Sequence, residues 1–221
     1  MLSTIKNKLN HYGICRDSKI IISISGGVDS IVLLDLMQKL NYNKLHLIHF
    51  NYKKHKKSKK ASDFIKKTSL KNNYNYKVYY PKVPKNNFEN LARINRYDIL
   101  LKYIKDKDCK YAFTAHHYDD QIETLIMKDS QNSDWISYLG IREKYGSIFR
   151  PLLDVKKNDI YKYAYKNKLL WFEDDTNKDL KYLRNKIRNR LSENKYTTEY
   201  ITSLINRHIH SKKNILEYSF L

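Results

Sequence analysis

Short apolar segments alternate with helix-period segments through the first 150 residues, and this alternation limits the fold more than any other feature. The pattern is typical of a parallel sheet with helices on both faces. The strands are predicted at 19–24, 44–49, 76–80, 110–114 and 147–149. The helices are predicted at 30–40, 59–72, 88–104 and 119–128. We therefore expect an α/β fold built on a parallel five-stranded sheet.

The helix predictions rest on the spacing of apolar residues. In 30–40 and 88–104 such residues recur at intervals of three and four, which indicates one buried stripe on each helix. The two predicted stripes consist of Leu33, Leu36, Met37 and Leu40, and of Leu91, Ile94, Tyr97, Ile99 and Leu101.

The alternation ends at Pro151, after which only helices are predicted, at 156–167, 181–192 and 198–218. We predict two domains, residues 1–150 around the sheet and a small helical extension at 151–221. A lysine-rich segment at 53–60 follows the second strand. It is interpreted either as a solvated loop or as a loop that closes on phosphates.

The chain is strongly basic, with 43 Lys and Arg against 23 Asp and Glu among 221 residues and a formal net charge of +20. This excess indicates a polyanionic partner such as nucleic acid. A compositional bias toward Lys, Asn, Tyr and Ile is the alternative explanation. Arginine is much rarer than lysine here, so each arginine suggests a need for a planar, forked donor.

The two cysteines, Cys15 and Cys109, lie far apart and form no C-x-x-C motif. This spacing argues against a disulfide framework, a zinc site or an iron–sulfur cluster. The sequence shows neither a secretory leader nor eighteen consecutive apolar residues, and hence no membrane partner is expected. We expect a soluble protein of the cytoplasm, or of an organelle.

The segment S-G-G-V-D-S, residues 25–30, lies between the first predicted strand and the first predicted helix. Paired glycines allow a sharp turn and a close approach of backbone amides to a ligand. We predict that this loop binds phosphate at the positive end of the helix. A carboxylate beside phosphates needs a cation between them, so Asp29 is the candidate Mg²⁺ ligand. A plain strand-to-helix turn capped by Asp29 or Ser30 is the alternative.

A second polar segment, T-A-H-H-Y-D-D-Q-I-E-T at 114–124, begins the helix after the fourth strand. Asp120 and Glu123 are three residues apart and share one face of that helix. They can receive an amine, and His116 or His117 can move protons near neutral pH. Capping of the helix and compensation of its dipole are the other roles open to the two carboxylates.

Arginines form a third group of candidates. Arg93 and Arg96 have helical spacing and can face phosphate, although a surface ion-pairing role is also open. Arg150 and the pair Arg184 and Arg188 lie in the sequence on either side of Trp171-Phe172. Arginines near aromatic residues suit a nucleotide that has left its stack. Taken alone, the two aromatic residues suit the core.

Taken in order, these segments resemble the tRNA(Ile)-lysidine synthase family, within the N-type ATP pyrophosphatases. The resemblance extends from about residue 19 to 191. It rests on S-G-G-V-D-S, H-F-N, A-R-I-N-R-Y, A-H-H-Y-D-D-Q-I-E-T, R-P-L-L, W-F-E-D-D-T-N and Y-L-R-N-K-I-R. The loop alone is common to the superfamily, whereas the segment at 116–124, followed by R-P-L-L and by R-N-K-I-R, is much more specific.

The resemblance implies an adenine nucleotide alpha hydrolase-like, Rossmann-like catalytic domain that uses ATP and Mg²⁺. It implies ligation of L-lysine to C2 of the wobble cytidine of CAU-anticodon tRNA(Ile), through an O2-adenylated base, with release of pyrophosphate and AMP. About thirty residues follow Leu191, so a short form without the usual C-terminal domains is expected.

The resemblance also implies roles for single residues. Ser25, Gly26, Gly27, Val28, Asp29, Ser30 and Arg96 would bind ATP, Asp29 through Mg²⁺. Asp120 and Glu123 would bind the incoming lysine, Arg93 would face ATP or the adenylated base, and His116 would carry a proton. Arg150, Arg184, Arg188 and Arg207 would contact tRNA.

Three other functions remain open at this point. A tRNA thiolase with the same loop would activate the same base for sulfur, although such enzymes usually need more cysteines. An amidotransferase-type synthetase would act on a small acid and would leave the basic charge unexplained. A non-catalytic nucleotide- and RNA-binding module would keep the loop without the reaction.

Overall fold

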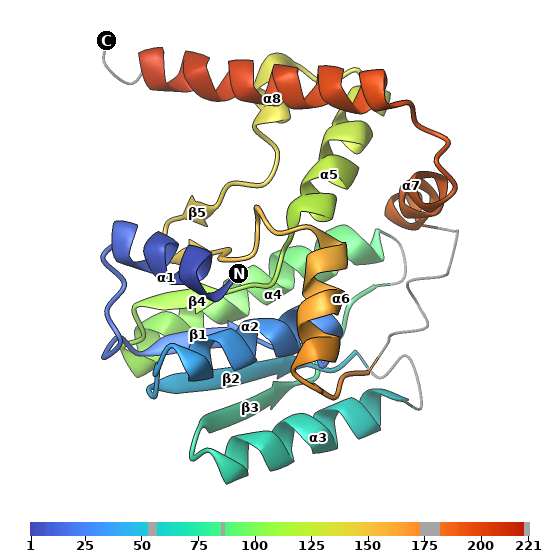
Figure 1. The fold of residues 1–221 in the computed structure, drawn as a ribbon. Helices are drawn as coiled ribbons and strands as arrows, with labels where there is room; N and C mark the ends of the chain where they lie inside the picture. Colours follow the sequence, from blue (N-terminus) through green and yellow to red (C-terminus); the bar gives the residue numbers. More distant parts are fainter. Residues whose placement is uncertain (53–56, 85–86, 173–181, 219–221) are drawn as a thin grey trace. The chain divides into compact units, whose positions relative to one another are not determined.

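The computed structural model describes residues 1–52, 57–84, 87–172 and 182–218 (Figure 1). The lysine-rich segment at 53–60 lies partly outside these residues, and the E-D-D-T-N part of the motif W-F-E-D-D-T-N lies wholly outside them. The chain divides into two compact units, residues 1–116 with 143–174, and residues 117–142 with 175–221. Each unit is described by itself.

The first unit contains a six-stranded sheet in the order β3-β2-β1-β4-β6-β5. Neighbouring strands are parallel except β5, which is antiparallel to β6. The five predicted strands are all present, and the prediction of a parallel sheet is confirmed for them. The two-residue β5 at the sheet edge was not predicted. The strands are β1 (Ile20–Ser23), β2 (Leu45–Phe50), β3 (Asn75–Tyr79), β4 (Tyr111–Phe113), β5 (Lys144–Tyr145) and β6 (Ile148–Phe149).

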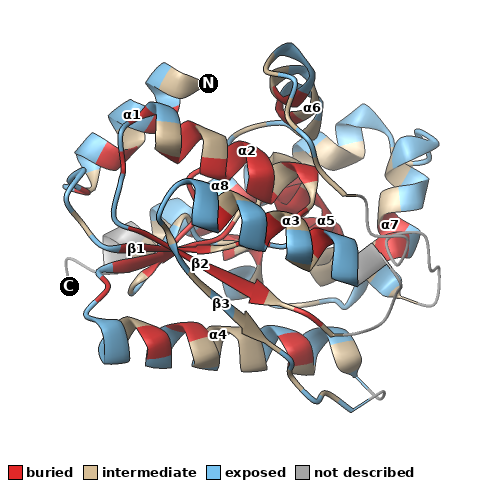
Figure 2. Ribbon diagram, turned by 90° about the horizontal axis from the view of Figure 1, so that it is seen from below, coloured by how far each residue is buried: buried red, intermediate tan, exposed pale blue. Residues whose placement is uncertain are grey.

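Helices cover both faces of the sheet, as predicted (Figure 2). Successive residues of β1 point to opposite faces, so Ile20 and Ile22 join one buried cluster and Ile21 joins the other. The first cluster includes residues of four helices and the second packs against one. The four are α1 (Leu2–His11), α2 (Val28–Lys39), α3 (Lys57–Lys71) and α6 (Lys157–Lys166), and the one is α4 (Phe88–Lys107).

The spacing of apolar residues predicted where the helices lie better than it predicted which of their faces are buried. All four residues of the first predicted stripe are buried, but α2 also buries Ile31, Val32 and Leu34, so it is a core helix and not an amphipathic one. The stripe predicted for α4 is wrong in phase. Its buried residues are Ala92, Leu100 and Tyr103, whereas Ile94 and Leu101 are exposed.

The second unit consists of α5 (Tyr118–Ser130), the short 3-10 helix η1 (Trp135–Leu139), α7 (Leu183–Ser192) and α8 (Thr198–Tyr218). Its core contains Ile122 and Leu125 of α5, Ile187 of α7 and Leu204 of α8. In the described part of the chain, no helix is both long enough and apolar enough to span a membrane.

The division into units does not follow the predicted boundary at residue 150. The contacts place α5 in the second unit, because its apolar face packs on α7 and α8, and they place α6 in the first unit, because it packs on α2. The assignment of residues 1–150 to ATP binding and catalysis, and of residues 151–221 to tRNA contact, stays a prediction.

Candidate nucleotide loop and acidic helix

The loop at residues 25–30 joins β1 to α2 through a bend that requires glycine at position 26. The φ of Gly26 is +91°, a value that residues with a side chain rarely adopt. A Cβ at this position would lie 3.1 Å from the Cβ of Ala61 on α3. Gly26 is also fixed from a second side, because its carbonyl accepts a hydrogen bond of 2.9 Å from the amide of Phe172. A side chain here would therefore adopt a strained backbone conformation and press closely on Ala61.

The backbone amides of the loop converge on two serine hydroxyl groups. The amides of Ser25 and Gly26 both donate to Ser30 Oγ at 3.2 Å, and the amide of Gly27 donates to Ser25 Oγ at 3.2 Å. Three successive N–H groups thus point at oxygen acceptors, the geometry expected of an anion-binding nest. Ser30 Oγ in turn donates to the Gly27 carbonyl at 3.0 Å.

Asp29, in the first turn of α2, forms an ion pair with Lys157 in the first turn of α6. The Nζ of Lys157 lies 2.6 Å from Oδ1 and 2.8 Å from Oδ2 of Asp29. The two side chains are about a quarter exposed, 29% for Lys157 and 25% for Asp29. Sequence analysis missed Lys157, because nothing in the spacing of residues 128 positions apart links them.

The carboxylate of Asp29 suits a magnesium ion that binds together with a nucleotide. Among the residues that the structure describes, no group of three or more His, Cys, Asp and Glu side chains could hold a metal ion. Mg²⁺ bound with a nucleotide needs only one or two carboxylates, since phosphates and water supply its other ligands. Both Asp29 oxygens already face a cation, the Lys157 ammonium group, so the carboxylate fits this task.

Asp120 caps the helix that carries it. The amide of His117, which precedes α5, donates to Oδ2 of Asp120 at 3.0 Å, and His117 Nε2 lies 3.5 Å from the same oxygen. The capping role that the sequence left open is therefore present. The other oxygen, Oδ1, lies 3.6 Å from Arg188 of α7.

Glu123 is buried and paired with arginine. Its side chain is only 2% exposed, and Arg188 donates to it through Nε at 2.8 Å and NH2 at 2.9 Å. Arg184 adds a second positive charge at 3.6 Å and donates to Thr124 Oγ1 at 2.9 Å. Burial raises the pKa of Glu123 above its ordinary value, while the hydrogen bonds and charge of Arg188 act in the opposite direction.

The structure thus brings together, within the second unit, the two carboxylates predicted to bind lysine and two of the four arginines predicted to contact tRNA, Arg184 and Arg188. The shared face of Asp120 and Glu123 follows from their spacing on α5. Their pairing with α7 could not be predicted from that spacing, because Glu123 and Arg188 are 65 residues apart in the sequence.

The remaining predicted residues have varied surroundings. His116 Nδ1 lies 2.9 Å from Thr114 Oγ1 at the end of β4. Arg93 is exposed on α4, and Arg96, one turn further, lies beside Tyr52. The Nε of Arg96 is buried and has no acceptor among the described residues.

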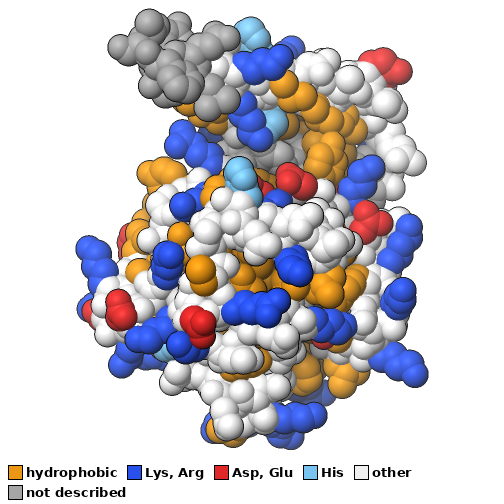
Figure 3. Space-filling view, turned by 60° about the vertical axis from the view of Figure 1, so that its left-hand side comes forward, with side chains coloured by type: hydrophobic (Ala, Val, Ile, Leu, Met, Phe, Trp, Pro, Cys, Tyr) orange, Lys and Arg blue, Asp and Glu red, His pale blue; other side chains and the backbone are white. Residues whose placement is uncertain are grey.

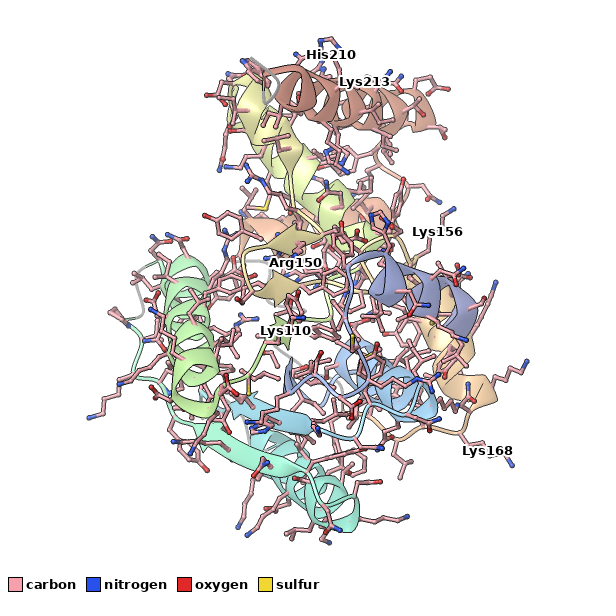
Figure 4. The ribbon with its side chains drawn as sticks, turned by 90° about the vertical axis from the view of Figure 1, so that its left-hand side faces the viewer. Lys110, Arg150, Lys156, Lys168, His210 and Lys213 are labelled. Carbon is pink, nitrogen blue, oxygen red and sulfur yellow. The ribbon has the colours of Figure 1, made fainter. Side chains whose placement is uncertain are left out.

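Two arginines predicted to contact tRNA have protein partners. Arg150 is 7% exposed and donates to the hydroxyl of Tyr97 at 2.9 Å, and Figure 4 shows it near β6. Arg207 of α8 lies 2.7 Å from Asp129 Oδ1 and 3.1 Å from the hydroxyl of Tyr138. Its tRNA contact stays a prediction.

Sequence analysis also left Gln121 of α5 without a role. Its Oε1 accepts a hydrogen bond of 2.6 Å from the amide of Ile141, and its Nε2 lies 3.1 Å from Nε2 of His208 on α8. Gly140, with φ of +58°, passes so close that a Cβ there would lie 2.5 Å from Nε2 of Gln121. Gln121 therefore fixes the loop after η1 and the middle of α8 to α5.

The first unit thus has a strand, a Gly-Gly bend and a helix, with successive amides of the bend directed at neighbouring oxygen acceptors. This arrangement defines a phosphate-binding class of α/β proteins. The PP-loop domain family model matches residues 1–195 of this chain. The chain therefore belongs to the PP-loop family.

Among curated proteins, the chain is similar to tRNA(Ile)-lysidine synthases of several bacteria. It is 36% identical to that of Wolbachia pipientis wMel over 187 residues, which cover 79% of this chain and 43% of the relative. It is 34% identical to that of Mycoplasma mycoides subsp. mycoides SC over 197 residues, 84% of this chain and 48% of the relative. The chain thus matches less than half the length of each of these relatives.

Solved structures show the same fold at low sequence identity. The U34-tRNA thiolase NcsA from Methanococcus maripaludis, solved with its [4Fe-4S] cluster, is 15% identical with a TM-score of 0.76, over 96% of this chain and 77% of that one. The NH3-dependent NAD synthetase from Campylobacter jejuni is 17% identical with a TM-score of 0.54, over 95% and 90%. At these identities the likeness concerns the fold alone.

Proposed function

We propose that this chain catalyses the ATP-dependent ligation of L-lysine to C2 of the wobble cytidine of CAU-anticodon tRNA(Ile), forming lysidine. The observation that carries this proposal is the identity of 34–36% to lysidine synthases over 187 and 197 residues. The loop at 25–30 and the acidic helix α5 both lie within residues 1–195, which the PP-loop domain model matches. The reaction releases pyrophosphate when the O2 of cytidine is adenylated, and AMP when the lysine ε-amine attacks C2.

In the proposed reaction the loop holds the triphosphate. Its amides converge on Ser25 Oγ and Ser30 Oγ, and phosphate oxygens can replace these hydroxyl groups as acceptors. Asp29 would bind Mg²⁺, which supplies charge neutralisation at the phosphates. Arg96 would contact the nucleotide, because its buried Nε has no acceptor among the described residues and an unsatisfied buried donor is costly. Arg93, exposed on the same helix, would face the base.

The acidic helix would hold the amine of lysine. Asp120 and Glu123 provide two carboxylates, and Arg188 lies against both. A lysine ammonium group can take the place of the Arg188 guanidinium without leaving Glu123 uncompensated. Arg188 would then be available to a tRNA phosphate, and His116 would carry a proton during attack.

The charge of the chain supports a nucleic-acid substrate. Lys and Arg side chains are spread over the face seen in Figure 3, where acidic side chains are few, and the net charge is +20. Arg150, Arg184, Arg188 and Arg207 are proposed to contact the tRNA.

Sulfur transfer is the less favoured reaction for this loop. The chain has two cysteines, and burial raises the pKa of Cys109 to about 11. Its thiol would stay protonated at neutral pH, whereas sulfur chemistry needs a thiolate. Cys15 is exposed and stands alone.

The proposal is tested by incubating the protein with ATP, L-lysine and a tRNA(Ile) transcript, and then measuring the masses of the digested nucleosides. We expect a cytidine heavier by lysine minus water, and AMP release that depends on lysine. A cytidine that gains sulfur would favour the thiolase. A protein that neither alters the tRNA nor exchanges pyrophosphate into ATP would be a binding module.

A further inference from the structure

The ion pair between Lys157 and Asp29 places a cation directly beside the phosphate loop. Asp29 is the third residue after Gly26, and its carboxylate accepts two bonds from the Lys157 ammonium group. The ammonium group also lies 5.1 Å from the centre of the Tyr161 ring. The aromatic face and the carboxylate together hold the lysine side chain toward the first turn of α2.

A lysine in this position is electrostatically unfavourable for its own helix. Lys157 is the first residue of α6, where the positive end of the helix dipole disfavours a cation. Asp159 supplies one anion within the same first turn, and an anion from outside the helix stabilises the cation further. Asp29 supplies one, and a phosphate bound at the loop would supply a stronger one.

The pair also differs from the other polar contacts between α2 and α6. Further along α2, Tyr163 donates to Asp35 at 2.7 Å and Lys39 donates to Asn167 at 2.6 Å. Those contacts join the two helices away from the loop. Only the Lys157 contact, among these, involves the residue that the loop sequence S-G-G-V-D-S itself contributes.

We propose that Lys157 binds a phosphate group of the nucleotide. This inference rests on the proposed function only in that it places ATP at the loop. The ammonium group has three N–H donors, so it can donate to a phosphate oxygen while it stays near Asp29, and Mg²⁺ held by Asp29 would leave it still more available to the phosphate. Lys157 thereby does what the lysine of a G-x-x-x-x-G-K-[ST] loop does, although it comes from a helix far along the chain.

The test measures, by equilibrium dialysis in EDTA, how tightly the wild-type chain and matched variants bind labelled ATP and labelled adenosine. Lys157→Gln removes the cation. Lys156→Gln is the control, because Lys156 is the adjacent lysine, exposed and extended away from the fold (Figure 4). A charged hydrogen bond contributes about 1.5–3 kcal/mol, or roughly ten-fold to a hundred-fold in affinity. We expect Lys157→Gln to weaken ATP binding at least about ten-fold and adenosine binding less than about two-fold.

Lys156→Gln should change neither affinity by more than about two-fold, and Lys157→Arg should recover part of the ATP affinity. Asp29→Asn removes the competing carboxylate, so ATP binding in EDTA should become about three-fold tighter, in line with the modest strength of partly exposed ion pairs. Unchanged ATP binding by Lys157→Gln would overturn the proposal. An equal loss of ATP and adenosine would also overturn it, because it would mean that Lys157 only supports the fold.

The outcomes for the proposed function are separate. A wild-type chain that binds no ATP, with or without Mg²⁺, refutes both ideas. A wild-type chain that binds ATP through Lys157 and yet forms no lysidine refutes the proposed reaction alone.

Discussion

The contact between Arg188 and Glu123 predicts an asymmetry between its two partners. Glu123 is 2% exposed, whereas the Arg188 side chain is 38% exposed. Loss of one partner from a buried ion pair costs about 3–5 kcal/mol. Arg184 remains 3.6 Å from Glu123, so we expect Arg188→Gln to lower the free energy of unfolding by about 2–3 kcal/mol at neutral pH. Glu123→Gln should cost about 1 kcal/mol or less, because the half-exposed guanidinium group can be hydrated.

The pH dependence of this loss in stability shows whether the uncompensated Glu123 carboxylate is its cause. Without Arg188, the interaction that opposes burial is lost, and the pKa of Glu123 rises further above its ordinary value. A folded-state pKa above the unfolded-state pKa means that the fold holds a proton that the unfolded chain releases. Stability is then greatest at low pH and falls as pH rises through the raised pKa. The loss caused by Arg188→Gln should therefore grow between about pH 5 and pH 8.

The measurement is urea unfolding followed by tryptophan fluorescence. Trp135 lies in the second unit and Trp171 in the first, and the chain has two tryptophans. In a Trp171→Phe background, fluorescence therefore reports the unit that contains the pair. Arg190→Gln is the matched control, since Arg190 is exposed on the same helix. A loss that is the same at every pH, or as large for Arg190→Gln, would refute the reasoning.

Three further results are expected. Gly26→Ala should weaken ATP binding in the dialysis assay, because the positive φ costs about 1–2 kcal/mol and the new Cβ lies 3.1 Å from the Cβ of Ala61. Gly13→Ala is the control and should leave ATP affinity unchanged, since Gly13 also has a positive φ but no atom lies within 4 Å of the added Cβ. A hydrogen bond from Tyr200 is the largest cause that lowers the pKa of Asp129. The stability that the Asp129 carboxylate contributes is therefore present at neutral pH and is lost as pH falls through that lowered pKa. Asp129→Asn should thus cost about 1–2 kcal/mol in urea unfolding at pH 7 and progressively less in acid, and an equal cost at both pH values would contradict this account. Affinity for tRNA should fall about eight-fold for each doubling of salt if four phosphates are contacted, and a filter-binding titration with flat affinity would argue against those contacts.

The fold could be predicted from the sequence because its signals are local. The predicted strands are short and largely apolar, and helix-period segments alternate with them. The Gly-Gly bend was predictable for the same reason, since a backbone turn between adjacent elements depends on the residues in the turn. The phase of α4 was not predictable, because Leu100 and Tyr103 are buried by the position of β1, β2, β4 and β6 and not by their own spacing.

The site could be predicted only in part, for a related physical reason. Residues such as Asp120 and Glu123, three positions apart on one helix, must share a face. Their partners come from helices that the chain reaches much later, and the sequence contains no spacing rule for such contacts. Lys157 and Gln121 were missed on this account, although Gln121 lies within a quoted motif and Lys157 only four residues after another.

The charged groups proposed to bind substrates are paired with one another in the structure. Arg188, which is proposed to bind a tRNA phosphate, donates to Glu123, which is proposed to bind the lysine amine. Lys157 likewise donates to Asp29. In each pair, the expected substrate charges match the partners that they would replace: an anion for the carboxylate and a cation for the basic group. Binding both substrate groups therefore exchanges partners without leaving a buried charge uncompensated, whereas binding of tRNA alone would draw Arg188 away from the buried Glu123 carboxylate. From this it follows that lysine and tRNA should each strengthen binding of the other, since each releases the group that the other needs. Titrations of lysine with and without tRNA would measure this coupling, and Arg188→Gln should remove it, because the carboxylates would then be open to the amine whether or not tRNA is bound.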